Sequence, residues 1–195
     1  MSKYKAVLLD VDGVLILPPR LYSEIYCEKY GKDLDQLTPF YKTDEFKASS
    51  VGRMDLKDAI TAHQDKWQWD GDLDQLINEW LEAENYPNED LLKVADKLRK
   101  AGTKVYIVTQ QEKYRTTFLR DKVFVGRYDG FLASCDLGLH KNTPEFWQEI
   151  VNRIGEEPSK TVYFDDKQNL VELAARLGID AHVYTDVESV KQIVE

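Results

Sequence analysis

Lys5-Ala6-Val7-Leu8-Leu9-Asp10-Val11-Asp12-Gly13 is the stretch that decides the fold of this chain. An apolar run that ends in carboxylates is typical of a buried strand, predicted over Lys5–Val11, with polar groups at its carboxyl end. In extended backbone, residues i and i+2 point the same way, so we expect Asp10 and Asp12 to converge. Gly13 lets the chain turn away sharply. Taken alone, the stretch is equally compatible with acidic residues that cap a strand and solvate a loop.

Four more short apolar runs predict buried strands, and segments with helical periodicity separate them. The five predicted strands cover residues 5–11, 104–109, 130–134, 161–164 and 181–185. Apolar stripes predict helices over residues 91–98, 114–121, 146–154 and 171–177. This alternation favours an α/β fold, a Rossmann-like parallel five-stranded sheet flanked by helices.

A long helical insert interrupts the pattern after the first strand. It shows no convincing strand, and prolines punctuate both of its connections. Amphipathic helices are predicted within it over residues 21–30, 56–67 and 73–84. We therefore expect a core domain of residues 1–17 and 88–195 and a small all-helical cap domain of residues 18–87. The insert carries 8 Lys or Arg and 15 Asp or Glu, so most of the net charge of −9 lies there.

Composition restricts the partners. The net charge of −9 argues against nucleic acid or an anionic membrane surface as a partner. No run of about eighteen apolar residues predicts a membrane span, and the N-terminal stretch lacks the pattern of a secretory signal. We expect a cytoplasmic protein, and its oligomeric state is not encoded in any pattern that we recognise.

Polar residues follow the predicted strands where a parallel sheet binds its ligands. Besides Asp10 and Asp12, the pair Asp165 and Asp166 follows the fourth strand. Carboxylates gathered at one edge repel each other unless a cation neutralises them, and an all-oxygen ligand set suits Mg²⁺. An N-cap of the following helix is the competing interpretation of the second pair.

Two further strand-end residues suit a phosphate group. Thr109 ends the second strand, and its hydroxyl with the free N–H groups beyond it fits a phosphate oxygen. Lys141 lies in the loop of residues 138–144 after the third strand and would neutralise a transferring phosphoryl group. Considered singly, a strand-end threonine and a solvated lysine are the simpler interpretations.

In this order, the residues resemble the motifs of the haloacid dehalogenase-like superfamily. The matching segments are Asp10-Val11-Asp12-Gly13-Val14, Thr109, Lys141 and Phe164-Asp165-Asp166-Lys167-Gln168-Asn169. The resemblance covers essentially the whole chain, and the insert resembles the helical cap that one subgroup carries after its first strand. It implies a phosphatase that hydrolyses a small phosphorylated metabolite through an aspartyl-phosphate.

The resemblance also implies a role for each matching residue. Asp10 would be the nucleophile and Asp12 the proton donor and acceptor. Mg²⁺ would be held by Asp10, the backbone carbonyl of Asp12, and Asp166, with Asp165 as a ligand or a supporting acceptor. The phosphoryl oxygens would be held by Thr109 and Lys141.

The chain departs from the family pattern at two places. Gln110 follows Thr109 where the family often has Asn, and Asn142 follows Lys141 where it often has Pro. These differences concern loop geometry and remove no catalytic charge. Gln110 and Arg53 are candidate substrate contacts, and a solvated loop arginine is the competing interpretation of Arg53.

Several other functions share part of this pattern. A phosphomutase of the same superfamily shares all four motifs. A catalytically inactive protein that binds a phosphorylated ligand would keep the same fold. A haloacid dehalogenase needs neither Asp12 nor Mg²⁺. A signalling receiver domain uses a similar set of residues, namely a phosphorylated Asp, an acidic pair, a Thr and a Lys. In a receiver the acidic pair comes first along the chain, whereas here it comes last. The acidic cap favours a small phosphomonoester, such as a sugar phosphate or nucleotide, over a polyphosphorylated substrate.

Overall fold

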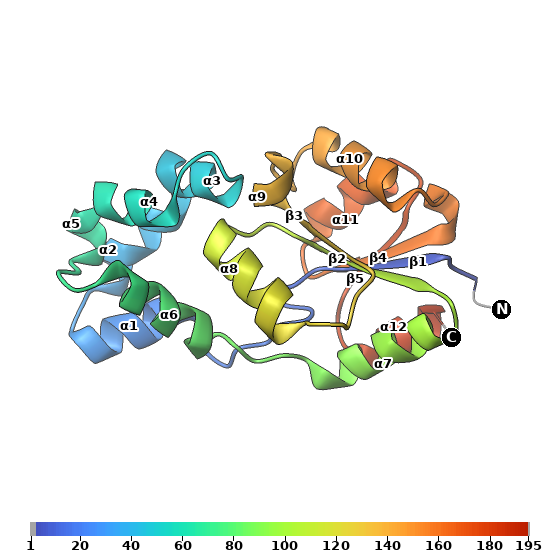
Figure 1. Cartoon of the computed structure of the whole chain (residues 1–195), viewed down its shortest axis with the longest axis horizontal. Coiled ribbons are helices and arrows are strands. Elements are labelled where there is room, and N and C mark those ends of the chain that lie inside the picture. The colour runs from blue at the N-terminus through green and yellow to red at the C-terminus, as the bar shows by residue number, and fades with distance from the viewer. Residues whose placement is uncertain (1–2, 195) are drawn as a thin grey trace.

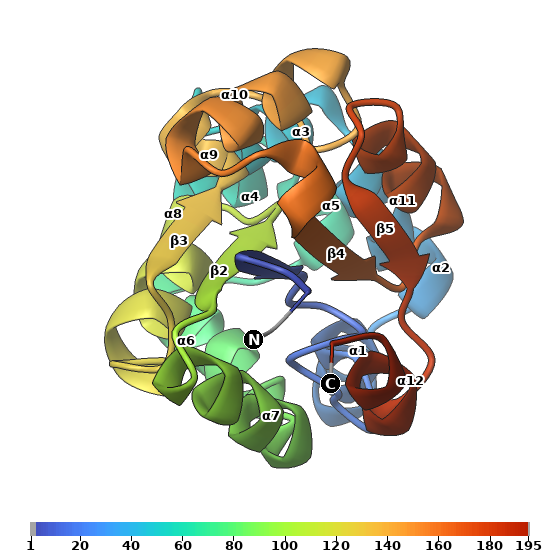
Figure 2. The same cartoon turned by 90° about the vertical axis from the view of Figure 1, so that its right-hand side faces the viewer.

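The computed structural model describes residues 3–194, in which a five-stranded sheet lies between layers of helices (Figure 1). The strands lie in the order β3-β2-β1-β4-β5, and all four neighbouring pairs are parallel (Figure 2). Their bounds are β1 Ala6–Leu9, β2 Lys104–Thr109, β3 Gly130–Ala133, β4 Thr161–Asp165 and β5 Asp180–Val183. The predicted Rossmann-like α/β fold is confirmed.

The central strand is shorter than predicted. It ends at Leu9 because the chain turns at Val11, whose carbonyl accepts from the backbone N–H groups of Val14, Leu15 and Ile16 at 2.8–3.2 Å. The prediction that extended backbone reaches Val11 is therefore wrong. Asp10 still follows the sheet, since its N–H donates to the carbonyl of Phe164 in β4 at 3.0 Å.

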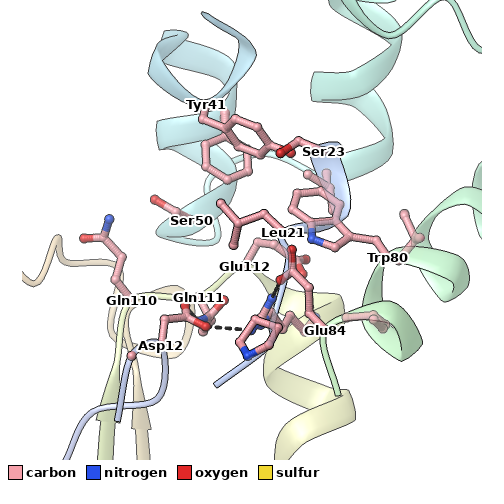
Figure 3. A pocket seen from close by; sticks show the side chains of 17 residues that line it. Asp12, Leu21, Ser23, Tyr41, Ser50, Trp80, Glu84, Gln110, Gln111 and Glu112 are labelled. Carbon is pink, nitrogen blue, oxygen red and sulfur yellow. Dashed lines mark hydrogen bonds and ion pairs between the residues drawn. The ribbon is translucent and has the colours of Figure 1, made fainter. Parts of the chain in front are cut away.

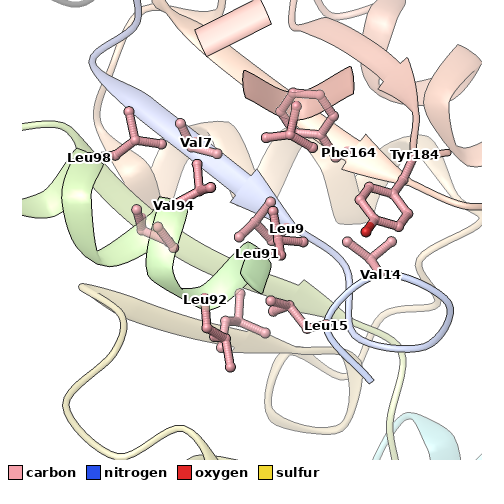
Figure 4. Packing of buried hydrophobic residues seen from close by; sticks show 14 of the residues in the cluster. Val7, Leu9, Val14, Leu15, Leu91, Leu92, Val94, Leu98, Phe164 and Tyr184 are labelled. Carbon is pink, nitrogen blue, oxygen red and sulfur yellow. The ribbon is translucent and has the colours of Figure 1, made fainter. Parts of the chain in front are cut away.

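Helices bury both faces of the sheet because the strands are apolar on both sides. Val7 and Leu9 face α7 (Glu89–Lys100) and α12 (Val187–Val194), as Figure 4 shows for α7. Leu8 points the other way, into a cluster with α10 (Pro144–Ile154) and α11 (Gln168–Ala175). Because β1 is also the middle strand of the sheet, its carboxyl end lies at the middle of one sheet edge.

Shorter elements complete the core. The predicted helix over residues 114–121 is α8 (Lys113–Phe118), continued by a π-helical turn, η2 (Leu119–Val123). The short α9 (Ser134–Leu137) follows β3, and η3 (Pro158–Lys160) precedes β4.

The insert, all of whose residues the structure describes, consists of short helices joined by turns and loops. Its elements are α1 Tyr22–Tyr30, α2 Leu34–Leu37, η1 Thr38–Lys42, α3 Asp44–Ser50, α4 Leu56–Ala62, α5 Gln64–Trp67 and α6 Leu73–Ala83. The prediction of one helix over residues 56–67 is wrong. The helix breaks at His63, which has φ −120° and whose ring nitrogen contacts the Glu45 carboxylate at 2.8 Å.

The insert has a hydrophobic cluster of its own. Trp67 is fully buried there, with its ring centroid 5.2 Å from that of Phe40 and 5.3 Å from that of Tyr26. Tyr114 of α8 packs against the same cluster from the core side. This separate cluster supports the division at residues 18–87, which stays a prediction.

The two connections of the insert lie side by side. Ile16 and Pro87 form an antiparallel bridge, the N–H of Leu17 donates to the Tyr86 carbonyl at 2.9 Å, and the N–H of Asn88 donates to the Leu15 carbonyl at 2.8 Å. Across residues 3–194, no helix is long and apolar enough to cross a membrane.

Candidate active site

The ammonium of Lys141 lies between two strand ends of the sheet. Its Nζ donates to Asp10 Oδ1 at 2.6 Å and to Asp165 Oδ2 at 2.7 Å. The side chains of Lys141, Asp10 and Asp165 are 2%, 9% and 0% exposed, so each charge depends on its partners for stability. The backbone around Lys141 is also held, because its N–H donates to Gln110 Oε1 at 3.0 Å and its carbonyl accepts from Trp147 Nε1 at 2.9 Å.

Burial shifts the ionisation of these groups. It raises the pKa of Asp10 to about 7, although the Lys141 ammonium opposes that shift. Burial would lower the pKa of Lys141, but the carboxylates of Asp10 and Asp165 outweigh it, and the net shift of the lysine pKa is upward. Lys141 therefore stays an ammonium. A divalent cation beside Asp10 would favour its carboxylate form.

Both carboxylate oxygens of Asp165 accept hydrogen bonds. Oδ2 accepts from Lys141 and from the hydroxyl of Tyr163, and Oδ1 accepts from the N–H of Lys167 at 2.7 Å. Burial raises the pKa of Tyr163 well above its usual range, so its hydroxyl acts as a donor. Of the two roles that the resemblance allows for Asp165, this geometry favours the supporting acceptor over the metal ligand.

Asp10, Asp165 and Asp166 form the acidic cluster, in which one oxygen of each residue lies within 4.8 Å of the others. Three carboxylates without His or Cys suit a hard cation such as Mg²⁺. Gly13 makes room for the third carboxylate, since a Cβ built on it would lie 2.7 Å from Asp166 Oδ2. The donor set and the space therefore fit a magnesium ion held by Asp10 and Asp166.

Asp12 lies at the same edge but faces other partners. Its Oδ1 accepts from Arg115 Nη2 at 2.6 Å, and its Oδ2 accepts from Gln111 Nε2 at 2.5 Å. The other arm of Arg115, Nη1, donates to Glu84 at the end of α6, and Glu84 also accepts from the N–H of Tyr22 at 2.9 Å. The Asp12 side chain remains 57% exposed, so it is oriented and still accessible.

The other predicted site residues lie in three different settings. Thr109 is the last residue of β2 and is 1% exposed. Gln110 contacts the Lys141 backbone and also lines the cavity described next. Arg53 is exposed, donates from Nη2 to the Gly138 carbonyl at 3.1 Å, and lies outside the cavity lining. The role of Arg53 as a substrate contact stays a prediction without support from the cavity.

A cavity of about 380 Å³ separates the insert from the sheet edge (Figure 3). The insert contributes a mainly apolar wall, in which Ser23, Ser50 and Glu84 are the polar residues and the apolar ones include Leu21, Tyr41, Phe46, Ile77, Trp80 and Leu81. The core contributes the polar end, with Asp12, Gln110, Gln111, Glu112 and Arg115. Asp12 is therefore part of the cavity lining, whereas Asp10 is buried and is not part of it.

Sequence reasoning missed Arg115, Glu84 and Gln111. Arg115 lies in α8 and Glu84 directly follows α6, without a local pattern that separates them from solvated charges. Gln111 follows the predicted Gln110, and its position next to a strand end was the one available signal.

An α/β core with buried strand-end carboxylates, a buried lysine and a helical insert over the site defines the class of capped α/β hydrolases. A family model described as haloacid dehalogenase-like hydrolase matches residues 4–178. The chain belongs to this family and is a hydrolase.

Similar structures agree with the fold. A predicted HAD-like family hydrolase from Porphyromonas gingivalis is 18% identical, with a TM-score of 0.82 and 98% of each chain covered. A HAD family enzyme from Bacteroides thetaiotaomicron, in complex with magnesium and inorganic phosphate, is 18% identical with a TM-score of 0.79, covering 93% of this chain and 94% of that one.

One curated relative matches over a shorter stretch. Flavin mononucleotide hydrolase 1 of Arabidopsis thaliana is 29% identical over 72 residues, which are 36% of this chain. The matched stretch spans 29% of that relative's length.

Proposed function

We propose that the protein is a Mg²⁺-dependent phosphatase that hydrolyses a small phosphomonoester. The observation that carries this proposal is the Lys141 ammonium, 2.6 Å from Asp10 and next to the acidic cluster, with Asp12 facing an adjacent cavity. A buried nucleophile beside a fixed cation suits a substrate group that is anionic, and the four sequence motifs resemble those of the phosphatases of this family. The magnesium and phosphate bound by the Bacteroides enzyme agree with this proposal.

The reaction proceeds in two displacements. An oxygen of Asp10 attacks phosphorus, the bond from phosphorus to the ester oxygen breaks, and Asp12 gives a proton to the departing alkoxide. A water then attacks the aspartyl-phosphate and loses a proton to Asp12. The acyl-phosphate bond breaks, which releases inorganic phosphate and restores Asp10.

Other residues of the chain hold the charges. Lys141 and Thr109 bind the phosphoryl oxygens, and Asp165 with Tyr163 keeps the ammonium in place. Magnesium held by Asp10 and Asp166 would neutralise the phosphoryl oxygens and reduce the repulsion between them and the carboxylates.

Hydrolysis of a panel of phosphomonoesters, flavin mononucleotide included, tests the proposal. We expect release of inorganic phosphate that requires Mg²⁺ and stops on addition of EDTA. Asp10→Asn removes the nucleophile and should lower kcat by at least about 10³-fold. Asp136→Asn, in the exposed part of α9, is a matched control that should retain activity. Full turnover by Asp10→Asn, or release of halide from haloacids alone, would overturn the proposal.

A further inference from the structure

The cavity beside Asp12 is the place of the leaving alcohol if the proposed function holds. Asp12 is the group that protonates the departing oxygen in the proposed reaction, and it lines the cavity, whereas Lys141 and Thr109 are buried and lie outside its lining. Whatever part of the substrate is esterified to phosphate must therefore extend from Asp12 into this space. The composition of the cavity then determines which alcohol fits.

Its insert side is mainly apolar and contains large flat rings. Ser50 and Glu84 also line that side, but the Ser50 hydroxyl already donates to the Lys47 carbonyl at 2.8 Å and Glu84 is paired with Arg115. Figure 3 shows Tyr41 and Trp80 on the insert side of the cavity, with Leu21 between them and Asp12. Trp80 is held in place by other rings, since it stacks on Tyr22 at 6.0 Å and 14° and lies 5.8 Å from Trp67. A polyhydroxylated alcohol would lose its hydrogen bonds to water against this wall, whereas a flat apolar group would gain contacts.

Two buried donors in the lining have no acceptor. Among the described residues, the Nε1–H of Trp80 and the Nε–H of Arg115 are buried polar groups without a hydrogen-bond partner. Both residues line the cavity. An unpaired buried donor costs free energy, and both N–H groups are covered by neighbouring side chains of the lining. A small shift of those side chains on binding would expose a donor, and a ligand with an acceptor atom in its ring would then be favoured over an all-carbon ring.

The charges of the lining disfavour a second anionic group. Arg115 is the only cationic side chain among the described residues that line the cavity, and it is already paired with Asp12 and Glu84. Glu112 also lies in the lining, where it accepts from the first N–H groups of α8. A carboxylate or second phosphate on the alcohol would meet these acidic groups without a free partner.

We infer that the substrate is a phosphomonoester of an uncharged alcohol bearing a flat, mainly apolar ring system with a hydrogen-bond acceptor. Sugar phosphates and bisphosphates are then poor substrates. This inference rests on the proposed function for the orientation of the substrate. The chemistry of the cavity itself carries the selectivity.

Three kinds of phosphate ester of primary alcohols test the selectivity, because their leaving groups are similar in basicity. They are 2-naphthylmethyl phosphate, the isomeric quinolinylmethyl phosphates and glucose 6-phosphate. We expect kcat/KM for naphthylmethyl phosphate to exceed that for glucose 6-phosphate by about 100-fold. At least one quinolinyl isomer should be better by a further factor of about 5. Equal or faster hydrolysis of glucose 6-phosphate would overturn the inference.

The substitution Trp80→Phe tests the hydrogen-bond donor of Trp80 separately from its aromatic ring. Of the two unpaired donors, we assign the ring acceptor to the indole N–H, because Trp80 belongs to the aromatic wall against which the ring would lie. The variant keeps an aromatic wall but has no indole N–H, so the quinolinyl and naphthyl esters should become equal substrates. Trp69→Phe is the matched control, because Trp69 is also in the insert, lies outside the cavity lining, and donates its Nε1–H to the Asp72 carbonyl at 3.1 Å. A preference for the quinolinyl ester that survives in Trp80→Phe would contradict the assigned donor.

Binding of the free alcohols tests the cavity without any hydrolysis, so failure of this inference can be told apart from failure of the proposed function. Quinolinylmethanol added to Asp10→Asn should shift the NMR signal of the Trp80 indole N–H, and glucose should not. Such a shift without hydrolysis of any ester in the wild type would overturn the phosphatase proposal and support the cavity assignment. Hydrolysis of esters without any shift of the Trp80 signal would overturn the cavity assignment alone.

Discussion

Gly13 lies so close to Asp166 that no other residue type fits beside it. Its φ is +77°, a conformation that side chains with a Cβ rarely adopt, and a Cβ there would lie 2.7 Å from both Asp166 Cγ and Oδ2. The glycine thus serves two purposes at once. It turns the chain after Asp10, the proposed nucleophile, and it leaves the space in which the carboxylate that would hold the metal lies.

Gly13→Ala should therefore weaken magnesium binding more than it weakens the fold. The methyl group pushes Asp166 away from Asp10, and we expect the Mg²⁺ concentration for half-maximal activity to rise by about tenfold or more. Titration of activity against Mg²⁺ measures this. Gly31→Ala is the control, because Gly31 has φ +63° but a Cβ at this position would meet no atom within 4 Å. It bears the same backbone strain of about 1 kcal/mol and should leave the Mg²⁺ dependence unchanged.

The residues that converge at strand ends are those that a single sequence reveals best. Asp10, Lys141 and Asp165 are predicted as site candidates because a parallel sheet brings the carboxyl ends of its strands to one edge, and the structure brings these three together. Arg115 escapes prediction because its importance depends on Glu84, 31 residues earlier in the chain, and on a turn of α8 that no local pattern specifies.

Arg115 connects three separate elements. From α8, it contacts Asp12 in the loop after β1 and Glu84 at the end of α6, and Glu84 in turn accepts from the first N–H of α1. The arginine and Glu84 side chains are 10% and 9% exposed. A charge buried to that degree is strongly destabilising when its partner is removed.

Arg115→Met should lower the free energy of unfolding by about 3 kcal/mol, because Glu84 is left buried without a cation. Urea unfolding of the wild type, Arg115→Met, Glu84→Gln and the double variant forms a double-mutant cycle that measures the coupling. The double variant should recover part of the loss. Additive effects of the two substitutions would show that the ion pair does not hold α8 to α6.

The boundaries of elements are less predictable than their existence. Alternating strands and helices of the core follow from apolar runs and stripes, and all five predicted strands are present. The end of β1 is hard to place from sequence because Val11 is apolar and β-branched, yet its carbonyl is used in a turn. The break between α4 and α5 at His63 has no local signal, and the contact that His63 makes there is with Glu45, 18 residues earlier in the chain.

At the scale of the whole molecule, the hydrophobic clusters of the insert and of the sheet are separate. Trp67 is buried within the first and Trp147 within the second, each with 0% exposure. Since each cluster is built mainly from its own segment of chain, we propose that residues 18–87 unfold as a cooperative unit distinct from the core.

Trp67→Ala and Trp147→Ala form a matched pair that tests this proposal. Each substitution should lower the free energy of unfolding of its own domain by about 3–5 kcal/mol, because each removes a large buried ring. Amide hydrogen exchange should show faster opening of α1 and α6 in Trp67→Ala with little change in β1 and β4, and the reverse in Trp147→Ala. A uniform loss of protection in either variant would mean that the molecule opens as one unit.

The pairing of Ile16 with Pro87 determines how the insert could be exchanged for another segment. Since the insert leaves and re-enters through one antiparallel pair of backbone segments, a reverse turn of about two residues would join the same two points without moving any strand of the sheet. To the backbone of the core, residues 18–87 are then equivalent to a hairpin loop, whereas the Arg115 side chain still needs the partner that Glu84 supplies. We expect that a single in-frame replacement that supplies a new partner for Arg115 would give the same core a different lid and, under the proposed function, a different set of alcohols.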